Sequence, residues 1–261
     1  MLLRHTCSAA MLLLPLAMPG HAQSLVDVVA LVQESVVGVG AAYPKRAPTG
    51  GNSPRRLFGS GFAITDERKR FIVTNYHVVD QRLDDQRGEH LAVFSGSGST
   101  AVEHEAAVIA YDEPHDLALL SYKGRALPPM ALASEDLVRV GERVAFTGFP
   151  IGAVLGLYPA THEGIVAAVA PIARPVDKGR ELNAVQMRRL RKPFWIYQLD
   201  AIAYPGNSGS AVYLQSSGHV VGVMNSVYVK ESRESLLERP SGISYAIPVT
   251  HLISLLESVP N

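Results

Sequence analysis

The chain alternates short apolar runs with turn-forming residues along most of its length. Runs rich in valine, isoleucine, phenylalanine and alanine are bounded by glycine, proline, serine or aspartate, which is typical of strands in a barrel or sandwich. A first group of predicted strands covers residues 36–42, 59–64, 71–74, 91–94, 102–109 and 117–122. A second group covers 143–148, 164–169, 195–199, 211–214, 219–224 and 243–247. The pattern predicts an all-β protein.

Helical spacing of apolar positions is found at the two ends of this β-rich region. Residues 25–34 and 249–258 carry apolar side chains three and four positions apart, so each predicts a short amphipathic helix. Between the two groups of strands, Pro128-Pro129 and the polar stretch 133–136 mark a crossing into a second unit. The predicted division is therefore residues 23–127 and residues 128–261.

The first 22 residues have the organisation of a signal peptide. Arg4 precedes an apolar stretch from Ala9 to Met18, and small residues at 20 and 22 predict cleavage after Ala22. The stretch is shorter than the roughly 20 residues that span a bilayer, although an N-terminal anchor remains the alternative. We expect an exported protein, in the bacterial periplasm or outside the cell, with no stable membrane insertion once this segment is removed. Removal also takes away Cys7, the only cysteine.

Charge and composition exclude several classes of function. Lysine plus arginine and aspartate plus glutamate both number 24, so no overall field attracts nucleic acid. The 9 histidines have no spacing typical of a metal site, and no glycine-rich cofactor motif is present. The sequence therefore predicts no metal, no cofactor and no nucleic-acid partner.

The segment Gly206-Asn207-Ser208-Gly209 is the main candidate for chemistry. Glycines two before and one after Ser208 permit a tight turn that exposes the hydroxyl and lets a substrate backbone approach. An ordinary hairpin is the alternative for this segment taken alone. Ser210 lacks this pair of glycines, so Ser208 is the candidate nucleophile.

A serine nucleophile needs a base and a group that orients the base. His77 closes a strand-like run that starts at Phe71, and Asp116 opens the apolar run 117–120. A carboxylate before such a run is expected to be partly buried and to need a partner. The nearest rivals are Asp112, which precedes a turn, and His115, whose side chain is expected on the opposite strand face. The order histidine, aspartate, serine matches one known arrangement of a catalytic triad.

Four motifs together resemble the HtrA branch of the trypsin-like serine endopeptidases. They are Thr74-Asn75-x-His77-Val78-Val79, Asp116-Leu117-Ala118-Leu119, Gln198-x-Asp200-Ala201 leading into Gly206-Asn207-Ser208-Gly209, and residues 242–248. The resemblance extends over residues 25 to 258. It implies two six-stranded antiparallel β-barrels, the first carrying His77 and Asp116 and the second carrying Ser208.

The resemblance also implies an activity. The expected enzyme is a serine endopeptidase that cleaves proteins or peptides through an acyl-enzyme and acts in protein quality control, with the N–H groups of Gly206 and Ser208 binding the oxyanion. It needs no cofactor, and its oligomeric state stays open, homo-oligomers included. An apolar pocket is expected to select small aliphatic residues before the cut. The residues expected to bind substrate are Ile202, Ala203, Tyr204, Val223, Met224 and Asn225.

The sequence departs from the HtrA pattern in two places. Ser210 stands where a second glycine is expected, as in glutamyl endopeptidases, and the printed chain ends at Asn261 without a PDZ-type domain. A glutamyl-endopeptidase-like enzyme and a catalytically silent binding or scaffold module are therefore the alternatives. Two basic segments, 45–56 and 174–192, are interpreted as solvated loops. The alternative for the first is a basic patch that binds a partner, and the alternative for the second is an activation loop.

Overall fold

The computed structural model of the protein describes residues 24–43, 55–66, 69–134, 136–150, 157–172, 193–225 and 243–260. The predicted signal peptide and the basic segment 174–192 lie outside the described residues. No helix within the described ranges is long and apolar enough to cross a membrane.

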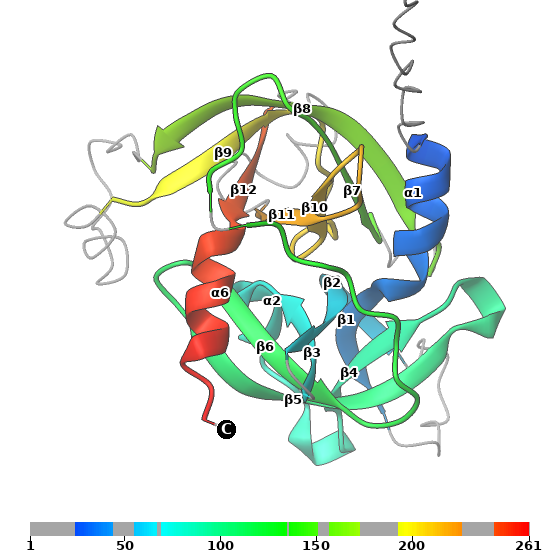
Figure 1. Ribbon diagram of the computed structural model, residues 1–261. Helices are drawn as coiled ribbons and strands as arrows, with labels where there is room; N and C mark the ends of the chain where they lie inside the picture. The colour runs from blue at the N-terminus through cyan, green and yellow to red at the C-terminus, as the bar shows by residue number, and fades with distance from the viewer. Residues whose placement is uncertain are drawn as a thin grey trace, which may run out of the picture.

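Two closed barrels of six antiparallel strands make up the structure (Figure 1). In the first barrel the strands follow the order β1-β2-β3-β6-β5-β4. Their bounds are β1 Val36–Ala42, β2 Arg55–Asp66, β3 Lys69–Thr74, β4 His90–Ser95, β5 Val102–Asp112 and β6 Leu117–Tyr122.

The second barrel repeats this architecture in the order β10-β11-β12-β9-β8-β7. Its strands are β7 Arg143–Gly148, β8 Ala160–Pro171, β9 Trp195–Asp200, β10 Ala211–Leu214, β11 Val220–Asn225 and β12 Ile243–Pro248. The all-β, two-barrel prediction is confirmed. The predicted boundary between residues 127 and 128 falls in the segment that joins the barrels, and the division itself stays a prediction.

One predicted loop is partly strand. Arg55 and Arg56 belong to the segment 45–56 that is predicted as a solvated loop, but they form the start of β2 and pair with Ala42 and Ala41 of β1. The Arg56 guanidinium lies 3.0 Å from Glu89, whose side chain is fully buried. A buried carboxylate needs such a partner, so the contact with Glu89 favours the position of Arg56 on the strand. The rest of that loop lies outside the described residues.

The run that carries His77 also differs from its prediction. The strand-like stretch was expected to continue to the histidine, but β3 ends at Thr74. Asn75 is extended, and Tyr76–Val79 then form the single-turn helix α2. His77 therefore lies on a helical turn beyond the strand end, where its side chain is less constrained by the alternation of the sheet.

Two helices lie outside the barrels, as predicted. The helix α1 (Leu25–Val32) is capped at its N-terminus by Ser24, whose hydroxyl accepts a hydrogen bond from the Asp27 N–H. The helix α6 (Val249–Glu257) follows β12 of the second barrel and runs beside the first barrel, where it contacts β5 (Figure 1). Short 3₁₀ turns lie at Gln33–Ser35, Asp85–Arg87 and Gly98–Thr100.

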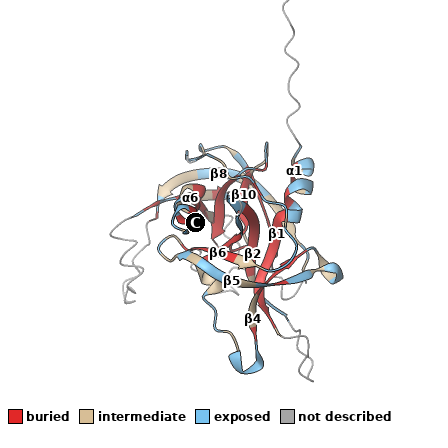
Figure 2. Ribbon diagram, turned by 60° about the horizontal axis from the view of Figure 1, so that its bottom comes forward, coloured by how far each residue is buried: buried red, intermediate tan, exposed pale blue. Residues whose placement is uncertain are grey.

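A continuous apolar core joins the two barrels. It contains Phe62, Val73 and Leu117 from the first barrel together with Ala211 and Val223 from the second. The strands β1 and β11 are buried along their whole length, while one side of α1 and parts of β5 are exposed (Figure 2). Because this shared core fixes the barrels against each other, side chains contributed by both can be held in one place.

Candidate active site

His77 and Asp116 form a tight pair at the ends of neighbouring segments of the first barrel. His77 Nδ1 lies 2.7 Å from Asp116 Oδ2, and the His77 backbone N–H donates to Asp116 Oδ1 at 2.8 Å. An ionised carboxylate can only accept, so the imidazole donates from Nδ1 and keeps Nε2 unprotonated. The carboxylate thus sets both the ring orientation and the tautomer that a general base requires.

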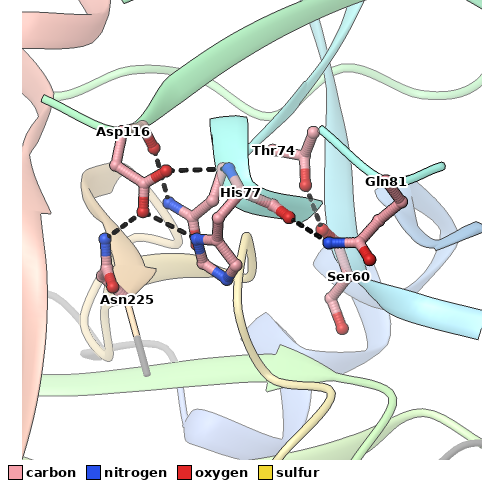
Figure 3. Close-up of polar contacts among 7 residues, drawn as sticks. Ser60, Thr74, His77, Gln81, Asp116 and Asn225 are labelled. Carbon is pink, nitrogen blue, oxygen red and sulfur yellow. Dashed lines mark hydrogen bonds and ion pairs between the residues drawn. The ribbon is translucent and has the colours of Figure 1, made fainter. Parts of the chain in front are cut away.

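Further contacts hold Asp116 in place (Figure 3). Asp116 is the only non-glycine described residue with a positive φ, at 57°, and its side chain is almost fully buried. The Asn75 side-chain amide donates to the Asp116 carbonyl at 2.9 Å, and Asn225 Nδ2 donates to Asp116 Oδ2 at 2.6 Å. Backbone strain of this kind persists where the surroundings determine it. The carboxylate itself accepts from three donors, which are His77 N, His77 Nδ1 and Asn225 Nδ2.

Ser208 lies in the tight turn between β9 and β10 of the second barrel, and the residue as a whole is only 4% exposed. Its carbonyl accepts a hydrogen bond from the Ser60 N–H at 2.8 Å. A Cβ built on Gly59 would lie 2.7 Å from the Val78 side chain and 2.8 Å from the Ser208 carbonyl oxygen. The backbone of Ser208 and the side chain of Val78, which follows His77, therefore both pack against Gly59 of β2.

Gly209 must be glycine for two reasons. Its φ is 87°, and an added Cβ would lie 2.1 Å from the Ser60 carbonyl oxygen and 2.4 Å from Thr74 Oγ1. A side chain at this position would be strained and would also push the turn away from the first barrel. The glycine after the serine, which the sequence singled out, is explained by this close approach.

Gly206, the other glycine of the motif, has a φ of 102°. Its carbonyl accepts from Ser60 Oγ at 2.6 Å, whereas its N–H makes no hydrogen bond to any other described residue. A backbone N–H without an acceptor can bind an incoming anionic oxygen. Gly206 can therefore supply one of the two donors that the sequence assigned to it and Ser208.

The residues predicted to bind substrate have different surroundings. Ile202 is 37% exposed, while Val223 and Met224 are fully buried in the apolar core. The Ala203 N–H donates to Ser244 Oγ at 2.9 Å, which fixes the segment between Ile202 and Tyr204. The place of these residues in a pocket stays a prediction.

Asn225, one of the residues predicted to bind substrate, contacts Asp116, and the sequence motifs do not predict this contact. It is the last residue of β11, and it is fully buried. A buried amide must find hydrogen-bond partners, so its position at the end of the apolar run 220–224 was the available signal. The partner itself lies 109 positions away in the chain.

The rival residues form a separate cluster. His115 Nδ1 lies 2.6 Å from Asp112 Oδ2, and the ring stacks on His251 of α6 with 3.9 Å between ring centroids. His115 lies in a turn, so the extended run assumed for its side-chain direction does not exist. Burial first, and then the neighbouring His115, lower the pKa of His251 from 6.5 to about 4. Burial alone would raise the pKa of Asp112, but the hydrogen bonds and charge of His115, with a smaller contribution from His251, lower it.

Replacing His251 with phenylalanine is expected to reduce the acid sensitivity of the fold. A histidine with a depressed pKa binds its proton more readily in the unfolded state, so stability falls as pH drops from 6.5 to about 4. Asp112, whose pKa is lowered, changes the stability only below its ordinary pKa of 3.8, which is outside this pH window. Melting temperatures measured across this range should decline less steeply for His251→Phe than for wild type. The exposed-site variant His219→Phe is the control, and equal slopes for all three proteins would contradict the prediction.

The chain belongs to the family of the trypsin-like peptidase domain, whose model matches residues 59–223. The match begins at the β2 segment that contacts Ser208 and ends on β11, so it includes the His77, Asp116 and Ser208 motifs.

Named relatives agree with the resemblance to the HtrA branch. The chain is 31% identical over 207 residues to a probable periplasmic serine endoprotease, DegP-like, of Pseudomonas fulva, with 78% of this chain and 36% of the relative covered. It is 27% identical over 202 residues to the chloroplastic Protease Do-like 5 of Arabidopsis thaliana, with 76% and 56% covered. The chain therefore spans between about a third and just over half of the length of these relatives.

Solved structures agree on the fold. The HtrA-type protease AlgW with a decapeptide superposes with a TM-score of 0.62 at 21% identity, and 91% of this chain and 67% of that chain are covered. At this identity the likeness establishes the two-barrel architecture alone.

Proposed function

We propose that this protein is a serine endopeptidase that hydrolyses peptide bonds of proteins. Ser208 Oγ attacks the substrate carbonyl carbon while His77 Nε2 takes the hydroxyl proton. The same proton passes to the leaving amine as the peptide bond breaks, which leaves an acyl-enzyme. Water, activated by His77, then hydrolyses the ester. Asp116 stays ionised throughout and stabilises the imidazolium that forms in each half-reaction.

The developing negative charge on the carbonyl oxygen is bound by the N–H groups of Gly206 and Ser208. Donors that are already oriented lower the barrier without a cost of reorganisation during the reaction, and one of them is typically worth about 3 kcal/mol. The N–H of Gly206 described above supports this role.

The observation that carries the proposal is the double contact between Asp116 and His77, in which one carboxylate oxygen holds the ring and the other holds the backbone N–H. The alternative of a silent binding module would not require this arrangement. Purified protein incubated with unfolded casein at neutral pH should release peptides, as resolved by gel electrophoresis and mass spectrometry. Intact casein after prolonged incubation with folded protein would contradict the proposal.

We further propose a preference for small aliphatic residues before the cut. Cleavage after arginine or lysine would require a carboxylate at the base of the pocket, and Ile202 occupies the position six residues before Ser208. Burying an unpaired cation there would cost several kcal/mol. Cleavage after glutamate would require a cation, and Val223 and Met224 supply none. An apolar pocket gains about 0.8 kcal/mol for each CH₂ that it buries.

Cleavage of a peptide library is therefore expected to be enriched for valine, alanine, isoleucine or leucine immediately before the cut. Sequencing the products by mass spectrometry gives the preference directly. Ser208→Ala protein, treated in the same way, identifies cuts made by contaminating proteases. Dominant arginine, lysine or glutamate at that position would show that the pocket has been assigned wrongly.

The site of action proposed here is the bacterial periplasm. The names of the DegP-like relatives and the signal-peptide pattern of residues 1–22 support this location. Protein recovered from an exporting bacterial host should begin near Gln23 when its N-terminus is sequenced. An intact Met1 on protein retained in the cytoplasm would contradict the proposal.

A further inference from the structure

Ser60 of β2 connects the first barrel to both sides of the candidate nucleophile. Its N–H donates to the Ser208 carbonyl at 2.8 Å, and its hydroxyl donates to the Gly206 carbonyl at 2.6 Å. One fully buried residue therefore binds two carbonyls of the turn between β9 and β10, although Ser60 and Gly206 are 146 positions apart in the chain. Neither the sequence motifs nor the triad assign a role to this hydroxyl.

The direction of the Ser60 hydroxyl proton follows from its two contacts. The Phe149 N–H donates to Ser60 Oγ at 2.8 Å, so the oxygen acts there as an acceptor. The Gly206 carbonyl can only accept, so the hydroxyl proton must point to it. The hydroxyl thus joins the residue after β7, the β2 strand and the turn of Ser208 in a defined orientation.

Ser60 is itself held from the side of the candidate base. Thr74 Oγ1 donates to the Ser60 carbonyl at 2.7 Å, and Thr74 is the last residue of β3, three positions before His77. A Cβ built on Gly148 would lie only 2.7 Å from Ser60 Oγ, so the backbone of β7 can pass this close to the hydroxyl only because residue 148 is a glycine. The anchor of Gly206 is therefore fixed on several sides.

We infer that Ser60 is a positioning residue for the oxyanion site, acting through the carbonyl of Gly206. Glycine has wide backbone freedom, and Gly206 has a positive φ, so the Gly206 N–H keeps a fixed direction only if neighbouring groups restrain the peptide units around it. The Ser60 hydroxyl restrains the carbonyl side of Gly206. This inference rests on the proposed peptidase function and adds a residue to the same site.

Ser60→Ala is expected to lower kcat for a peptide substrate by about 100-fold, because a small misplacement of a reacting group has an effect of that size. KM should change much less, since the hydroxyl does not touch substrate. Ser95→Ala is the matched control, because it removes a buried hydroxyl that contacts His104 at 2.8 Å within the first barrel. Rates are expressed per active site counted with a fluorophosphonate. Ser60→Cys keeps the shape with a weaker donor, and it should also lose kcat.

A peptidyl chloromethyl ketone with ¹³C at its carbonyl gives a readout that a purely structural role would not move. Reaction with the site forms a hemiketal oxyanion, whose ionisation is followed by NMR as the pH is changed. The hemiketal pKa should be higher in Ser60→Ala and Ser60→Cys than in wild type and Ser95→Ala. Unchanged ionisation and unchanged kcat per site in either folded Ser60 variant would overturn the inference. Wild-type protein that reacts with neither reagent would instead overturn the proposed function, and this inference with it.

Discussion

Replacing Ser208 or His77 with alanine is expected to lower kcat for peptide hydrolysis by about a million-fold, because nucleophile and base act as one unit. Removing both should cost hardly more than removing either one. The measurement is hydrolysis of a fluorogenic peptide by wild type, the two single variants and the double variant, after each has been shown to melt cooperatively.

The matched controls are Ser254→Ala on α6 and His219→Ala after β10, both of which change exposed side chains. Both should retain wild-type kcat. Activity near the wild-type level in folded Ser208→Ala or His77→Ala would refute the assignment of that residue. If the double variant lost kcat by the product of the two single losses, Ser208 and His77 would not act in one shared step.

Asp116→Asn should lower kcat by about 10,000-fold without disturbing the fold. The three groups that contact the carboxylate oxygens are all donors, namely His77 N, His77 Nδ1 and Asn225 Nδ2. An asparagine NH₂ at one of these positions faces another donor, and the imidazole then favours the tautomer with the proton on Nε2. Asparagine accepts positive φ more readily than most residues, so the backbone at 116 can stay as it is.

Asp112→Asn is the matched control for that substitution. Asp112 lies four positions before Asp116, and its carboxylate makes a similar hydrogen bond to a histidine ring, that of His115. The kcat of Asp112→Asn should remain within a few-fold of wild type. If Asp112→Asn lost activity while Asp116→Asn stayed active, Asp112 rather than Asp116 would be the residue that orients the catalytic histidine.

Local sequence pattern predicted the strands well because the ends of most strands are set by nearby residues. The run 117–122 starts directly after a turn, and the run 211–214 starts where a glycine-rich turn ends. The prediction was wrong where contacts from elsewhere decide the outcome. Arg56 at the start of β2 contacts Glu89, and the backbone N–H of His77 in the helical turn donates to Asp116.

The candidate site could be predicted in its components but not in its connections. His77, Asp116 and Ser208 stand out through neighbouring apolar runs and glycines, which are local features. The contacts from Asn225 to Asp116 and from Ser60 to Gly206 join distant parts of the chain, and they exist only because the barrels close and share one core. No periodicity in the sequence specifies which strand end meets which turn.

The central claim, that Ser208 is an activated nucleophile, is tested most directly by covalent labelling. Folded wild-type protein should react with a fluorophosphonate, and mass spectrometry of a digest should locate one adduct on the peptide that contains Ser208. Heat-unfolded wild type and folded Ser208→Ala should remain unlabelled, while Ser254→Ala should label like wild type. An unlabelled wild-type protein, or an adduct on another residue, would contradict the account.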